Sequence, residues 1–500
     1  MHKLLSSLID VLNPLETHNT GSVVIRGIAY DSRDVKEGYA FFALPGTHTD
    51  GKRFIGAAVD AGASLIVYQG GLDNIPEGIA WIKVADARRA MSAFSAAFYD
   101  RPSEKLRIIG VTGTDGKSST SYYIWQLLRS LGYKCGIITT VLYSTGGDAV
   151  PNPLRQSSPE APFVHAALYD MLLEGCEIAV VESTSHGLSP RTARLADVAF
   201  DAGVFTNITH EHLEFHGSFE NYLSDKAELF RRLPDYGAAI INLDDKQSAY
   251  LAEQTKARRL YYSASGNNKA DLWAKDIHGS LEGTELELLT NSLSKKIRLP
   301  LIGEFNADNV MAAVLACKEI TGKSIDTIIE KSMELKSLDG RMQAIRCGQP
   351  FGVIVDYAHT PGAFERLFPF VKRFTHGRII TVFGSAGERD TEKRPWQGSI
   401  ADRYADIIIL TDEDPRLEDR MGILRDIAEG CTKKSEGKDL FLIPDRKKAI
   451  EHAFGIAKKG DLVLLLGKGH EKSIVMADGT IPWHEAKVAE EILASMGYKI

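Results

Sequence analysis

Residues 106–132, "LRIIGVTGTDGKSSTSYYIWQLLRSLG", decide how the central part of this chain folds. The apolar run at the start is typical of a buried strand, and the residues after Lys117 have the apolar period of a helix. A glycine-rich turn between a strand and a helix directs backbone N–H groups and the helix N-terminus at an anion. The stretch therefore predicts a phosphate-binding loop, with Lys117 at the terminal phosphates and the Ser118 hydroxyl on Mg2+.

The spacing of this loop differs from the ordinary Walker pattern G-x-x-x-x-G-K-[ST], which would need a glycine where Val111 stands. A glycine-rich turn with a surface lysine is the alternative, but the strand and the helix on either side favour phosphate binding. The nucleotide-binding residues predicted from the loop are Gly110, Thr112, Gly113, Thr114, Asp115, Gly116, Lys117, Ser118 and Ser119.

Three blocks can be separated around the loop. Residues 1–104 mix short strand-like runs with helical stretches, whereas residues 105–336 and 337–500 alternate buried-strand runs with helices. Such alternation predicts parallel sheets with crossover helices, whose ligands bind at the carboxyl ends of the strands. We therefore expect an α/β protein with three domains: a mixed α/β N-terminal domain, a central P-loop ATPase-like parallel-sheet domain and a C-terminal Rossmann-like doubly wound domain.

The composition gives no sign of a nucleic-acid partner or of membrane insertion. The formal net charge is -7, whereas nucleic-acid binding favours a basic face. No apolar run approaches the ~18 residues that a membrane span needs. Five scattered cysteines without CxxC spacing argue against a zinc site and a disulfide frame, and for a reducing compartment. We expect a soluble cytoplasmic protein.

The first residues, "MHKLLSSLIDVLNPLE", predict a short amphipathic helix. Their leucines and Ile9 fall at helical spacing, while Asp10 interrupts the apolar run and Pro14 follows it. A signal peptide would need an uninterrupted apolar run and a small-residue cleavage site.

Several further motifs resemble one enzyme family. "GTDGKSS" resembles the nucleotide loop of the Mur ligases and of their folylpolyglutamate synthase relatives, and "GEFNADN" (303–309) and "GRM" (340–342) resemble later motifs of the Mur ligases. The resemblance extends over nearly the whole chain. The motifs similar to the subfamily that adds the third peptide residue are "DSRDVKEGYAFFALPGTHTDGKRF" from Asp31, "DYAHTP" from Asp356, "GERDTEKRP" from Gly387, "DEDPR" from Asp412 and "GKGHE" from Gly467.

This resemblance implies an ATP-dependent ligase of peptidoglycan precursor synthesis. Such an enzyme adds a diamino acid to UDP-N-acetylmuramoyl-L-alanyl-D-glutamate through an acyl phosphate, uses ATP and Mg2+, and is expected to be a monomer. A folylpolyglutamate synthase-like ligase is one alternative, but it would lack the N-terminal block. A non-catalytic nucleotide-binding regulator is another, and it predicts loss of a catalytic group, whereas Lys117, Glu182, His212 and Lys226 are all present.

Those four residues are the predicted catalytic set, and Ser118, Glu182, His212 and Lys226 are the predicted metal ligands. Glu182 ends the strand-like run "CEIAVVE", so it is placed to share a metal with Ser118; an exposed strand-end glutamate is the alternative. By resemblance alone, His212 binds a second metal, and Lys226 carries N6-carboxylation that turns its ammonium into an anionic ligand. Without the resemblance, Lys226 would be interpreted as a solvated helical lysine.

The substrate ligands are also assigned by resemblance. Asn306 and Arg341 are expected to hold the nucleotide, with a surface loop as the alternative for each. Thr192 stands where the family has an arginine, so Arg191 is assigned to the substrate anion and Arg194 remains an alternative. The full set assigned to the UDP-sugar peptide is Ser32, Ser157, Ser158, Thr184 and Arg191.

The pocket for the third amino acid is assigned to Arg389, Asp414, Arg416, Gly467 and Glu471. Members that use meso-diaminopimelate commonly read D-N-P-R, and Asp414 replaces that asparagine here. An ionised aspartate would repel a distal carboxylate unless it is protonated or turned toward Arg416. With Arg416 as its partner, Asp414 could instead attract the distal ammonium of lysine or ornithine. The two arginines favour diaminopimelate, and the other two diamino acids remain open.

Overall fold

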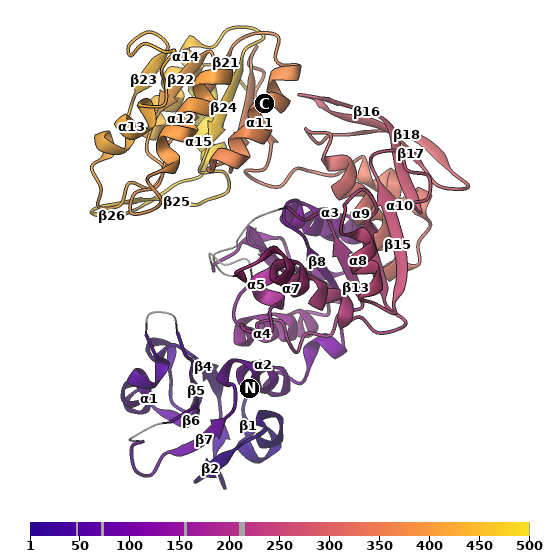
Figure 1. Cartoon of the computed structure of the whole chain (residues 1–500), viewed down its shortest axis with the longest axis vertical. Coiled ribbons are helices and arrows are strands. Elements are labelled where there is room, and N and C mark those ends of the chain that lie inside the picture. Colours follow the sequence, from indigo (N-terminus) through magenta and orange to yellow (C-terminus); the bar gives the residue numbers. More distant parts are fainter. Residues whose placement is uncertain (47–48, 72–74, 155–157, 210–215, 500) are drawn as a thin grey trace. The chain divides into compact units, whose positions relative to one another are not determined.

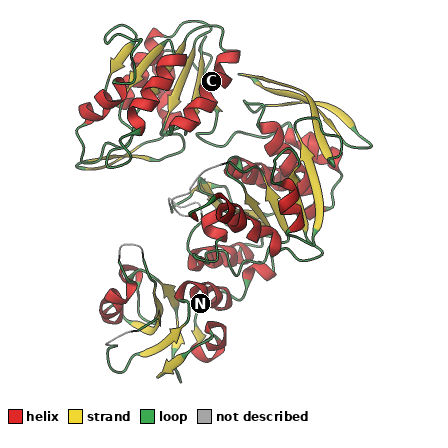
Figure 2. Ribbon diagram, in the orientation of Figure 1, coloured by secondary structure: helices red, strands yellow, loops and turns green. Residues whose placement is uncertain are grey.

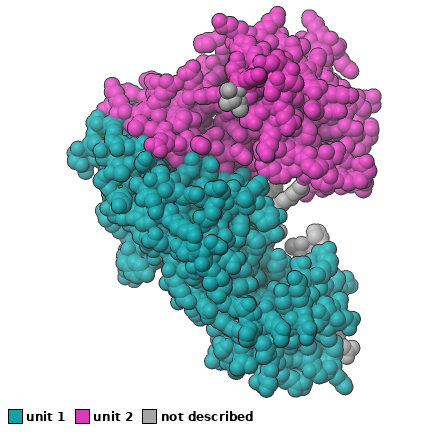
Figure 3. Space-filling view, turned by 180° about the vertical axis from the view of Figure 1, so that it is seen from behind, with its two compact units in different colours: residues 1–275, 288–295, 308–332 teal, residues 276–287, 296–307, 333–500 magenta. Residues whose placement is uncertain are grey.

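The structure is a computed structural model that describes residues 1–46, 49–71, 75–154, 158–209 and 216–499. Helices and strands alternate along the chain (Figure 1, Figure 2), which confirms the α/β class. The chain packs into two compact units (Figure 3), each described by itself below. Unit 1 contains residues 1–275, 288–295 and 308–332, and unit 2 contains residues 276–287, 296–307 and 333–500.

The N-terminal part of unit 1 is a small mixed sheet with helices. Its elements are β1 (Lys3–Leu4), β2 (Glu16–His18), β3 (Val24–Ile25), β4 (Gly27–Ala29), β5 (Tyr39–Ala43), α1 (Ile55–Asp60), β6 (Ala63–Gln69), β7 (Ala80–Val84) and α2 (Ala87–Phe98). The sheet order is β2-β7-β6-β5-β4, with β2 antiparallel and the others parallel. Helix α2 begins where the Asp86 carboxylate accepts the N–H groups of Arg88 and Arg89. Its apolar face packs on this sheet, with Phe94 against Phe42.

The prediction of a short amphipathic helix near the N-terminus is wrong. Two 3₁₀ turns take its place, η1 (Leu5–Ser7) and η2 (Ile9–Leu12), and the chain then turns at Asn13 with φ of 46°. Leu5, Leu8 and Leu12 are buried in the same core as α2. The leucine spacing thus identified the buried side chains, but packing against the sheet selected the tighter turns.

The central part of unit 1 is built on a parallel sheet. Its strands are β8 (Arg107–Thr112), β9 (Cys135–Ile138), β12 (Ile178–Glu182), β13 (Ala202–Phe205), β14 (Ala238–Asn242) and β15 (Arg258–Ser263), with β10 (Leu142–Ser144) and β11 (Val150–Pro151) at one edge. The order β9-β12-β8-β13-β14-β15 is parallel throughout. The ends of β8, β12 and β13 therefore lie side by side, which brings together the glycine loop, Glu182 and the segment after Phe205.

Helices cover both faces of this sheet. They are α3 (Lys117–Ser130), α4 (Ala161–Leu173), α5 (Ser185–Leu188), α7 (Phe219–Arg231), α8 (Ser248–Glu253), α9 (Asn306–Thr321) and α10 (Ile325–Ser332). Strands β16 (Leu272–Ser280), β17 (Gly283–Leu289) and β18 (Ser294–Leu299) lie between α8 and α9 in the chain. Helix α7 buries Leu229 and Phe230 in the main core of the unit, which points Lys226 toward the glycine loop.

The C-terminal part of unit 2 is a doubly wound sheet, as predicted. Its strands are β19 (Gln343–Ala344), β20 (Gly352–Asp356), β21 (Ile379–Phe383), β22 (Ile407–Leu410), β23 (Leu440–Leu442), β24 (Leu462–Leu466), β25 (Ser473–Met476) and β26 (Gly479–Pro482). Its helices are α11 (Pro361–Phe374), α12 (Lys393–Tyr404), α13 (Arg420–Ala428), α14 (Arg446–Ile456) and α15 (Glu485–Ser495). The order β20-β24-β21-β22-β23 is parallel. Helices α11, α12 and α13 bury one core, and α14 and α15 bury another with residues of the same strands.

No helix in the described residues is long and apolar enough to cross a membrane. The boundaries 1–104, 105–336 and 337–500 remain a prediction.

Candidate active site

The glycine loop joins β8 to α3 as the sequence predicted, and two of its glycines cannot be replaced without strain. Gly113 has φ of 148° and Gly116 has φ of 81°, conformations that side chains disfavour. A Cβ on Gly113 would lie 1.9 Å from Thr206 Oγ1, and one on Gly116 would lie 2.4 Å from Asn309 Oδ1. The loop is therefore packed against two other segments of unit 1.

Gly110 has a different reason to be a glycine. It lies inside β8, and a Cβ there would lie 2.6 Å from Leu229 Cδ1 and 2.8 Å from Phe200 Cε1. This glycine allows α7 to pack closely on the sheet, so it reaches a phosphate only indirectly.

Residues directly after β13 hydrogen-bond to the backbone of the loop, a role that was not predicted from the sequence. Asn207 accepts the Thr114 N–H through its backbone oxygen at 2.7 Å and the Asp115 N–H through Oδ1 at 3.0 Å. The Thr206 hydroxyl donates to the Asp115 carbonyl at 2.6 Å. Two of the N–H groups predicted for phosphate are thus used inside the protein, which leaves the start of α3 as the anion-facing part. Thr206 and Asn207 directly follow the apolar run that forms β13, and this position in the sequence could have indicated these contacts.

Lys117 and Ser118 project from the first turn of α3. The Lys117 ammonium donates to the Thr114 carbonyl at 2.6 Å, so it lies folded across the loop. The Ser118 hydroxyl donates to Glu182 Oε2 at 2.9 Å. The structure therefore brings together the hydroxyl and the carboxylate that were predicted to share a metal.

Glu182 is buried, with 2% of its surface exposed, so the alternative of an exposed strand-end glutamate is wrong. The Thr140 backbone N–H donates to Glu182 Oε2 at 2.9 Å, and the Thr140 hydroxyl donates to Oε1 at 3.1 Å. These contacts fix both carboxylate oxygens beside Ser118. Thr140 follows β9, the strand next to β12, and its sequence carried no signal for this role.

Lys226 is the largest departure from the interpretation based on its residue type. Its side chain is 1% exposed, whereas a solvated helical lysine was the expectation without the family resemblance. The ammonium donates to the Gly113 carbonyl at 2.6 Å and lies 4.3 Å from the centre of the Tyr222 ring. The Tyr222 hydroxyl is in turn 3.1 Å from Thr114 Oγ1. Helix α7 thus presents a buried cation to the glycine loop.

The oxygen donors here fit a magnesium ion. Ser118 Oγ and the Glu182 carboxylate are hard donors held side by side, and phosphate oxygens complete such a site in P-loop proteins. No group of three or more histidine, cysteine, aspartate or glutamate side chains suited to a metal occurs in the described residues. His212 lies outside them.

A second group of polar side chains surrounds the N-terminus of α5. Ser158 Oγ and Thr184 Oγ1 are 2.9 Å apart, and Thr184 also accepts the Gly187 N–H at 3.1 Å. Of the predicted pair Ser157 and Ser158, the first lies outside the described residues. The structure thus brings together Thr184 and Ser158, two of the residues assigned to the UDP-sugar peptide.

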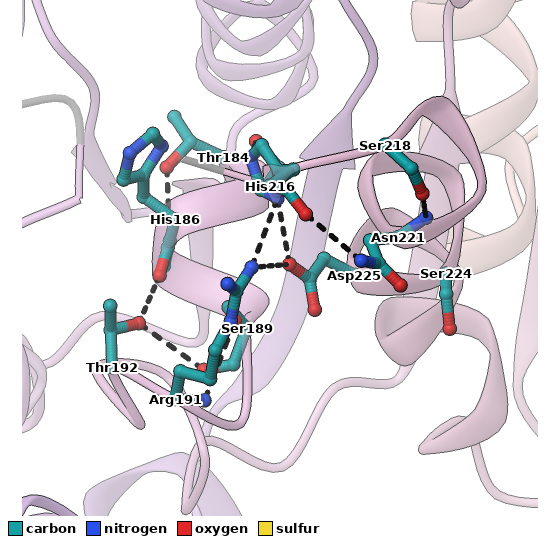
Figure 4. Close-up of polar contacts among 12 residues, drawn as sticks. Thr184, His186, Ser189, Arg191, Thr192, His216, Ser218, Asn221, Ser224 and Asp225 are labelled. Atoms are coloured by element: carbon teal, nitrogen blue, oxygen red, sulfur yellow. Dashed lines mark hydrogen bonds and ion pairs between the residues drawn. The ribbon is translucent and has the colours of Figure 1, made fainter. Parts of the chain in front are cut away.

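The two candidate arginines differ in their surroundings. Arg194 pairs with Glu160 at 2.9 Å and donates to the Ser158 carbonyl at 2.9 Å. The Arg191 side chain is 52% exposed and pairs with Asp225 at 3.2 Å (Figure 4). Arg191 is therefore the more accessible of the two for a substrate anion.

Figure 4 also shows a buried histidine that the sequence analysis did not assign a role. His216 Nδ1 lies 2.8 Å from Asp225 Oδ2, and Nε2 lies 3.1 Å from Ser185 Oγ. Burial lowers the pKa of His216, and the Asp225 carboxylate opposes that shift. Since Asp225 precedes Lys226, this network also fixes the end of α7 that approaches the loop.

Ser32 begins the 3₁₀ turn η3 (Ser32–Asp34), whose N-cap Asp31 accepts the Arg33 N–H at 3.0 Å. Burial and the charge of Glu160 raise the pKa of the neighbouring Tyr30. The Glu160 carboxylate also lies 3.6 Å from the Arg88 guanidinium of α2, so the N-terminal part of unit 1 lies near the segment that contains Ser158.

In unit 2, Asn306 starts α9 and its side-chain amide donates to the Ile302 carbonyl at 2.9 Å. It is 4% exposed, so the alternative of a surface loop is wrong for this residue. The Arg341 guanidinium lies 5.1 Å from the centre of the Tyr357 ring, beyond the end of β20.

The predicted amino-acid pocket lies at the carboxyl ends of β22 and β24. Asp414 is 7% exposed, and its Oδ1 accepts the Lys468 ammonium at 2.8 Å and the Val475 N–H at 2.9 Å. Lys468 also donates to Glu471 Oε2 at 2.5 Å. Arg416 was the partner considered for Asp414 from the sequence, whereas the structure pairs Asp414 with the buried Lys468 of "GKGHE".

The other residues assigned to the pocket differ in exposure, and no contact joins Arg389 to this ion pair in the described residues. Arg389 is exposed, and Arg416 has φ of 54° and donates its N–H to the Val475 carbonyl at 3.0 Å. Gly467 has φ of 97° and lies beside Glu413. Burial raises the pKa of Glu413 to about 7, although Lys393 and Lys468 act in the opposite direction.

Comparisons with known proteins identify the family of this chain. Family models match the chain in three segments: the Mur ligase family catalytic domain over residues 24–99, the Mur ligase middle domain over residues 111–317, and the Mur ligase glutamate ligase domain over residues 340–469. The first match covers most of the block that a folylpolyglutamate synthase would lack, so that alternative is not supported.

Curated relatives match nearly the whole length of the chain. A UDP-N-acetylmuramyl-tripeptide synthetase of Borreliella afzelii is 48% identical, with 94% of each chain covered. A UDP-N-acetylmuramoyl-L-alanyl-D-glutamate--2,6-diaminopimelate ligase of Clostridium tetani is 34% identical, with 98% of this chain and 99% of the relative covered. A solved structure described as a ligase of the latter kind is 29% identical, with a TM-score of 0.68 over 99% of both chains. This chain belongs to the Mur ligase family, with its three-domain architecture.

Proposed function

We propose that this protein is an ATP-dependent ligase that joins a diamino acid to UDP-N-acetylmuramoyl-L-alanyl-D-glutamate. The observation that carries the proposal is the convergence of Lys117, Ser118, Glu182 and Lys226 on one glycine loop. Those groups suit the transfer of a phosphoryl group to an anion. The similarity to tripeptide synthetases over 94% of the chain identifies the acceptor class.

The reaction begins between two anions. A carboxylate oxygen of the substrate attacks the γ-phosphorus of ATP, the bond to ADP breaks, and an acyl phosphate results. The amine of the diamino acid then attacks the acyl carbon, phosphate leaves, and the amine loses a proton. Lys117 moves from the Thr114 carbonyl to the γ-phosphate and offsets its charge, since the loop carbonyl is a weaker partner than a phosphate.

Magnesium would supply most of the remaining positive charge at this loop. Ser118 and Glu182 would hold one ion, and His212 is assigned to a second by family resemblance alone. Lys226 would ligate metal only as an N6-carboxylated anion, because an ammonium has no lone pair to donate. In its uncharged form the buried amine would react with CO2 and release a proton. As an ammonium, Lys226 would instead stabilise the loop through Gly113.

The remaining assignments follow the same family pattern. The UDP-sugar peptide would be held by Ser32, Ser157, Ser158, Thr184 and Arg191, and the nucleotide by Asn306 and Arg341. The amino acid would be held by Arg389, Asp414, Arg416, Gly467 and Glu471. The chain would act as a monomer in the cytoplasm, and residues 1–104, 105–336 and 337–500 would be its domains. These statements remain predictions.

The experiment combines the purified chain, ATP, Mg2+ and UDP-N-acetylmuramoyl-L-alanyl-D-glutamate with lysine, ornithine or meso-diaminopimelate. The proposal expects phosphate release that depends on both acceptor and amino acid, together with a new UDP-sugar tripeptide by mass spectrometry. Binding of ATP without product from any of the three amino acids would favour a non-catalytic regulator. Phosphate release with a folate acceptor in place of the UDP-sugar would contradict the substrate assignment.

A further inference from the structure

His216 contacts two helices of unit 1 that carry candidate site residues. Helix α5 follows Thr184, and α7 contains Lys226. His216 Nδ1 lies 2.8 Å from Asp225 Oδ2 on α7 (Figure 4), and Nε2 lies 3.1 Å from Ser185 Oγ on α5. His216 is 1% exposed, so both contacts are shielded from water. The imidazole therefore joins the two helices inside the protein.

The two partners of His216 decide which ring nitrogen carries the proton. A carboxylate only accepts hydrogen bonds, so we assign the proton to Nδ1, which donates it to Asp225. Nε2 is then an acceptor, and the Ser185 hydroxyl donates to it. A neutral imidazole offers one donor and one acceptor on a rigid ring, which is what this position between α5 and α7 uses.

Asp225 connects His216 to Arg191. Arg191 Nη2 lies 3.2 Å from Asp225 Oδ2, the same oxygen that accepts from His216. The two nitrogens are 3.5 Å apart because both converge on that oxygen. The Asp225 side chain is 11% exposed, whereas the Arg191 side chain is 52% exposed. The buried carboxylate thus anchors Arg191, while half of the arginine side chain stays accessible to a substrate anion.

His216 also packs against the ring beneath Lys226. The centres of the His216 and Tyr222 rings are 5.0 Å apart, and the Lys226 ammonium lies 4.3 Å from the centre of the Tyr222 ring. The Tyr222 hydroxyl lies 3.1 Å from Thr114 Oγ1 in the glycine loop. Loss of the imidazole would leave a cavity beside Tyr222, into which this ring could move. One buried ring therefore supports groups on both the peptide side and the phosphate side.

The consequence for the reaction rests on the proposed function. The acceptor carboxylate must meet the γ-phosphorus of ATP in a defined position, and a displacement of about 1 Å can cost about 100-fold in rate. Arg191 would hold an anionic group of the acceptor, and Lys226 lies at the loop that would hold the phosphates. A buried group that fixes both residues therefore controls how the acceptor meets ATP.

We propose that His216 and Asp225 are positioning residues for the UDP-sugar peptide. The His216 N–H orients the Asp225 carboxylate, that carboxylate holds Arg191 toward an anionic group of the acceptor, and the His216 ring fixes α5 against α7. Hydrogen bonds to charged groups are about twice as strong as neutral ones, so the shared Asp225 oxygen is a firm anchor for Arg191.

This arrangement predicts an effect on one substrate above the others. Loss of the anchor should raise KM for the UDP-sugar dipeptide far more than KM for ATP or for the diamino acid, because Arg191 would contact the dipeptide alone. The value of kcat should fall as well, because Tyr222 loses its support. A side chain that serves only the stability of the fold would not separate the three substrates.

The first test measures the three KM values of the full-length enzyme in two variants that each keep one contact. The side-chain nitrogen of His216→Asn takes the place of Nδ1, whereas that of His216→Gln extends to the place of Nε2. We expect His216→Gln to raise KM for the UDP-sugar dipeptide at least about tenfold, with the other two KM values changed less than about threefold. His216→Asn, which keeps a donor for Asp225, should hold KM for the dipeptide within about threefold of the wild-type value.

The outcomes of this test are distinct. An equal rise of all three KM values in His216→Gln would indicate a structural role alone and would overturn the proposal, as would an unchanged KM for the dipeptide. No product from the wild-type enzyme with lysine, ornithine or diaminopimelate would instead contradict the proposed function. His376→Gln, at an exposed position of unit 2, is the matched control and should change no KM value.

A second test covers the case in which His216→Gln fails to fold. Asp225→Asn keeps the shape and removes the charge, so KM for the dipeptide should rise at least about fivefold. In an Arg191→Ala background the same change should add less than about twofold, because Asp225 acts through Arg191. An unchanged KM in Asp225→Asn, or a full additional loss in the Arg191→Ala background, overturns the proposal. Asp478→Asn, at an exposed position, is the control.

Discussion

The candidate functional residues lie at the edges of two sheets, and the two edges differ in the kinds of polar group that they contain. The glycine loop of unit 1 consists of backbone held by Thr206 and Asn207, with two lysines donating to its carbonyls. At the edge of unit 2, buried Asp414 and partly exposed Glu471 share the Lys468 ammonium. The first arrangement suits a highly charged anion, whereas in the second one buried cation compensates two carboxylates. Parallel sheets place polar groups at the same edge in both cases, and the local residues decide the charge of the ligand.

The largest expected effect tests the cationic side of this comparison. Lys117→Ala should lower kcat for ATP-dependent ligation by about 1000-fold, because the phosphoryl group loses its main side-chain cation. Phosphate release measures the change, and Lys246→Ala, at an exposed position, is the control. Activity within tenfold of the wild-type enzyme would show that the loop does not use this ammonium.

Lys226→Ala is expected to come next, with a loss of about 100-fold, because both the loop and any metal ligand are misplaced. Short-chain carboxylic acids added to the variant distinguish two roles for the residue. Rescue would support N6-carboxylation, whereas rescue by small amines alone would support a buried ammonium. A variant as active as the parent would remove Lys226 from the site.

Gly113→Ala tests whether ATP binding depends on the packing of the loop backbone. The added Cβ would meet Thr206 Oγ1 at 1.9 Å, so we expect at least about a tenfold loss of ATP affinity through displacement of the loop. Gly132→Ala is the matched control, since Gly132 also has positive φ, of 90°, but open space around its Cα. It should cost about 1 kcal/mol of stability and leave nucleotide binding unchanged. Equal ATP affinity in both variants would contradict the packing argument.

The smallest effect concerns stability on the anionic side. The pKa of Glu413 is raised from 4.5 in the unfolded chain to about 7 in the fold. Its contribution to stability is therefore fully present below pH 4.5 and is lost as the pH rises through 7. Glu413→Gln should thus gain stability relative to the wild-type protein as the pH rises from 4.5 to 7, by on the order of 1–3 kcal/mol.

Thermal unfolding at several pH values measures this difference. Glu429→Gln should show no pH-dependent difference, because its side chain lies at the surface. A constant offset between Glu413→Gln and the wild-type protein at every pH would show that Glu413 ionises normally.

Local patterns predicted the elements better than the side-chain partners. The strand–loop–helix stretch at 106–132 specified its own fold, because a glycine-rich turn between two apolar segments has few alternatives. The doubly wound sheet of unit 2 could also be predicted, because buried parallel strands appear in the sequence as continuous apolar runs. The prediction of an α-helix at the N-terminus was wrong. The spacing of its leucines fits 3₁₀ turns as well as an α-helix, and packing selected the 3₁₀ turns.

The contacts of the candidate site could be predicted only in part from the sequence. Ser118 and Glu182 could be paired from their positions at neighbouring strand ends, but Thr140 could not, because nothing local marks it. Lys226 looked solvated until α7 was packed on the sheet with that face inward. For Asp414 the sequence suggested Arg416 as the partner, whereas the structure pairs it with Lys468.

The sequence by itself determined where phosphate-binding backbone and polar strand ends occur, because those properties depend on residues that are neighbours in the chain. Only the tertiary structure decided which charges compensate one another. Asp414 and Lys468 are 54 positions apart, and Lys226 and Gly113 are 113 apart. The strength of an electrostatic interaction depends on the distance between the charges and on their burial, and the order of the residues gives neither quantity.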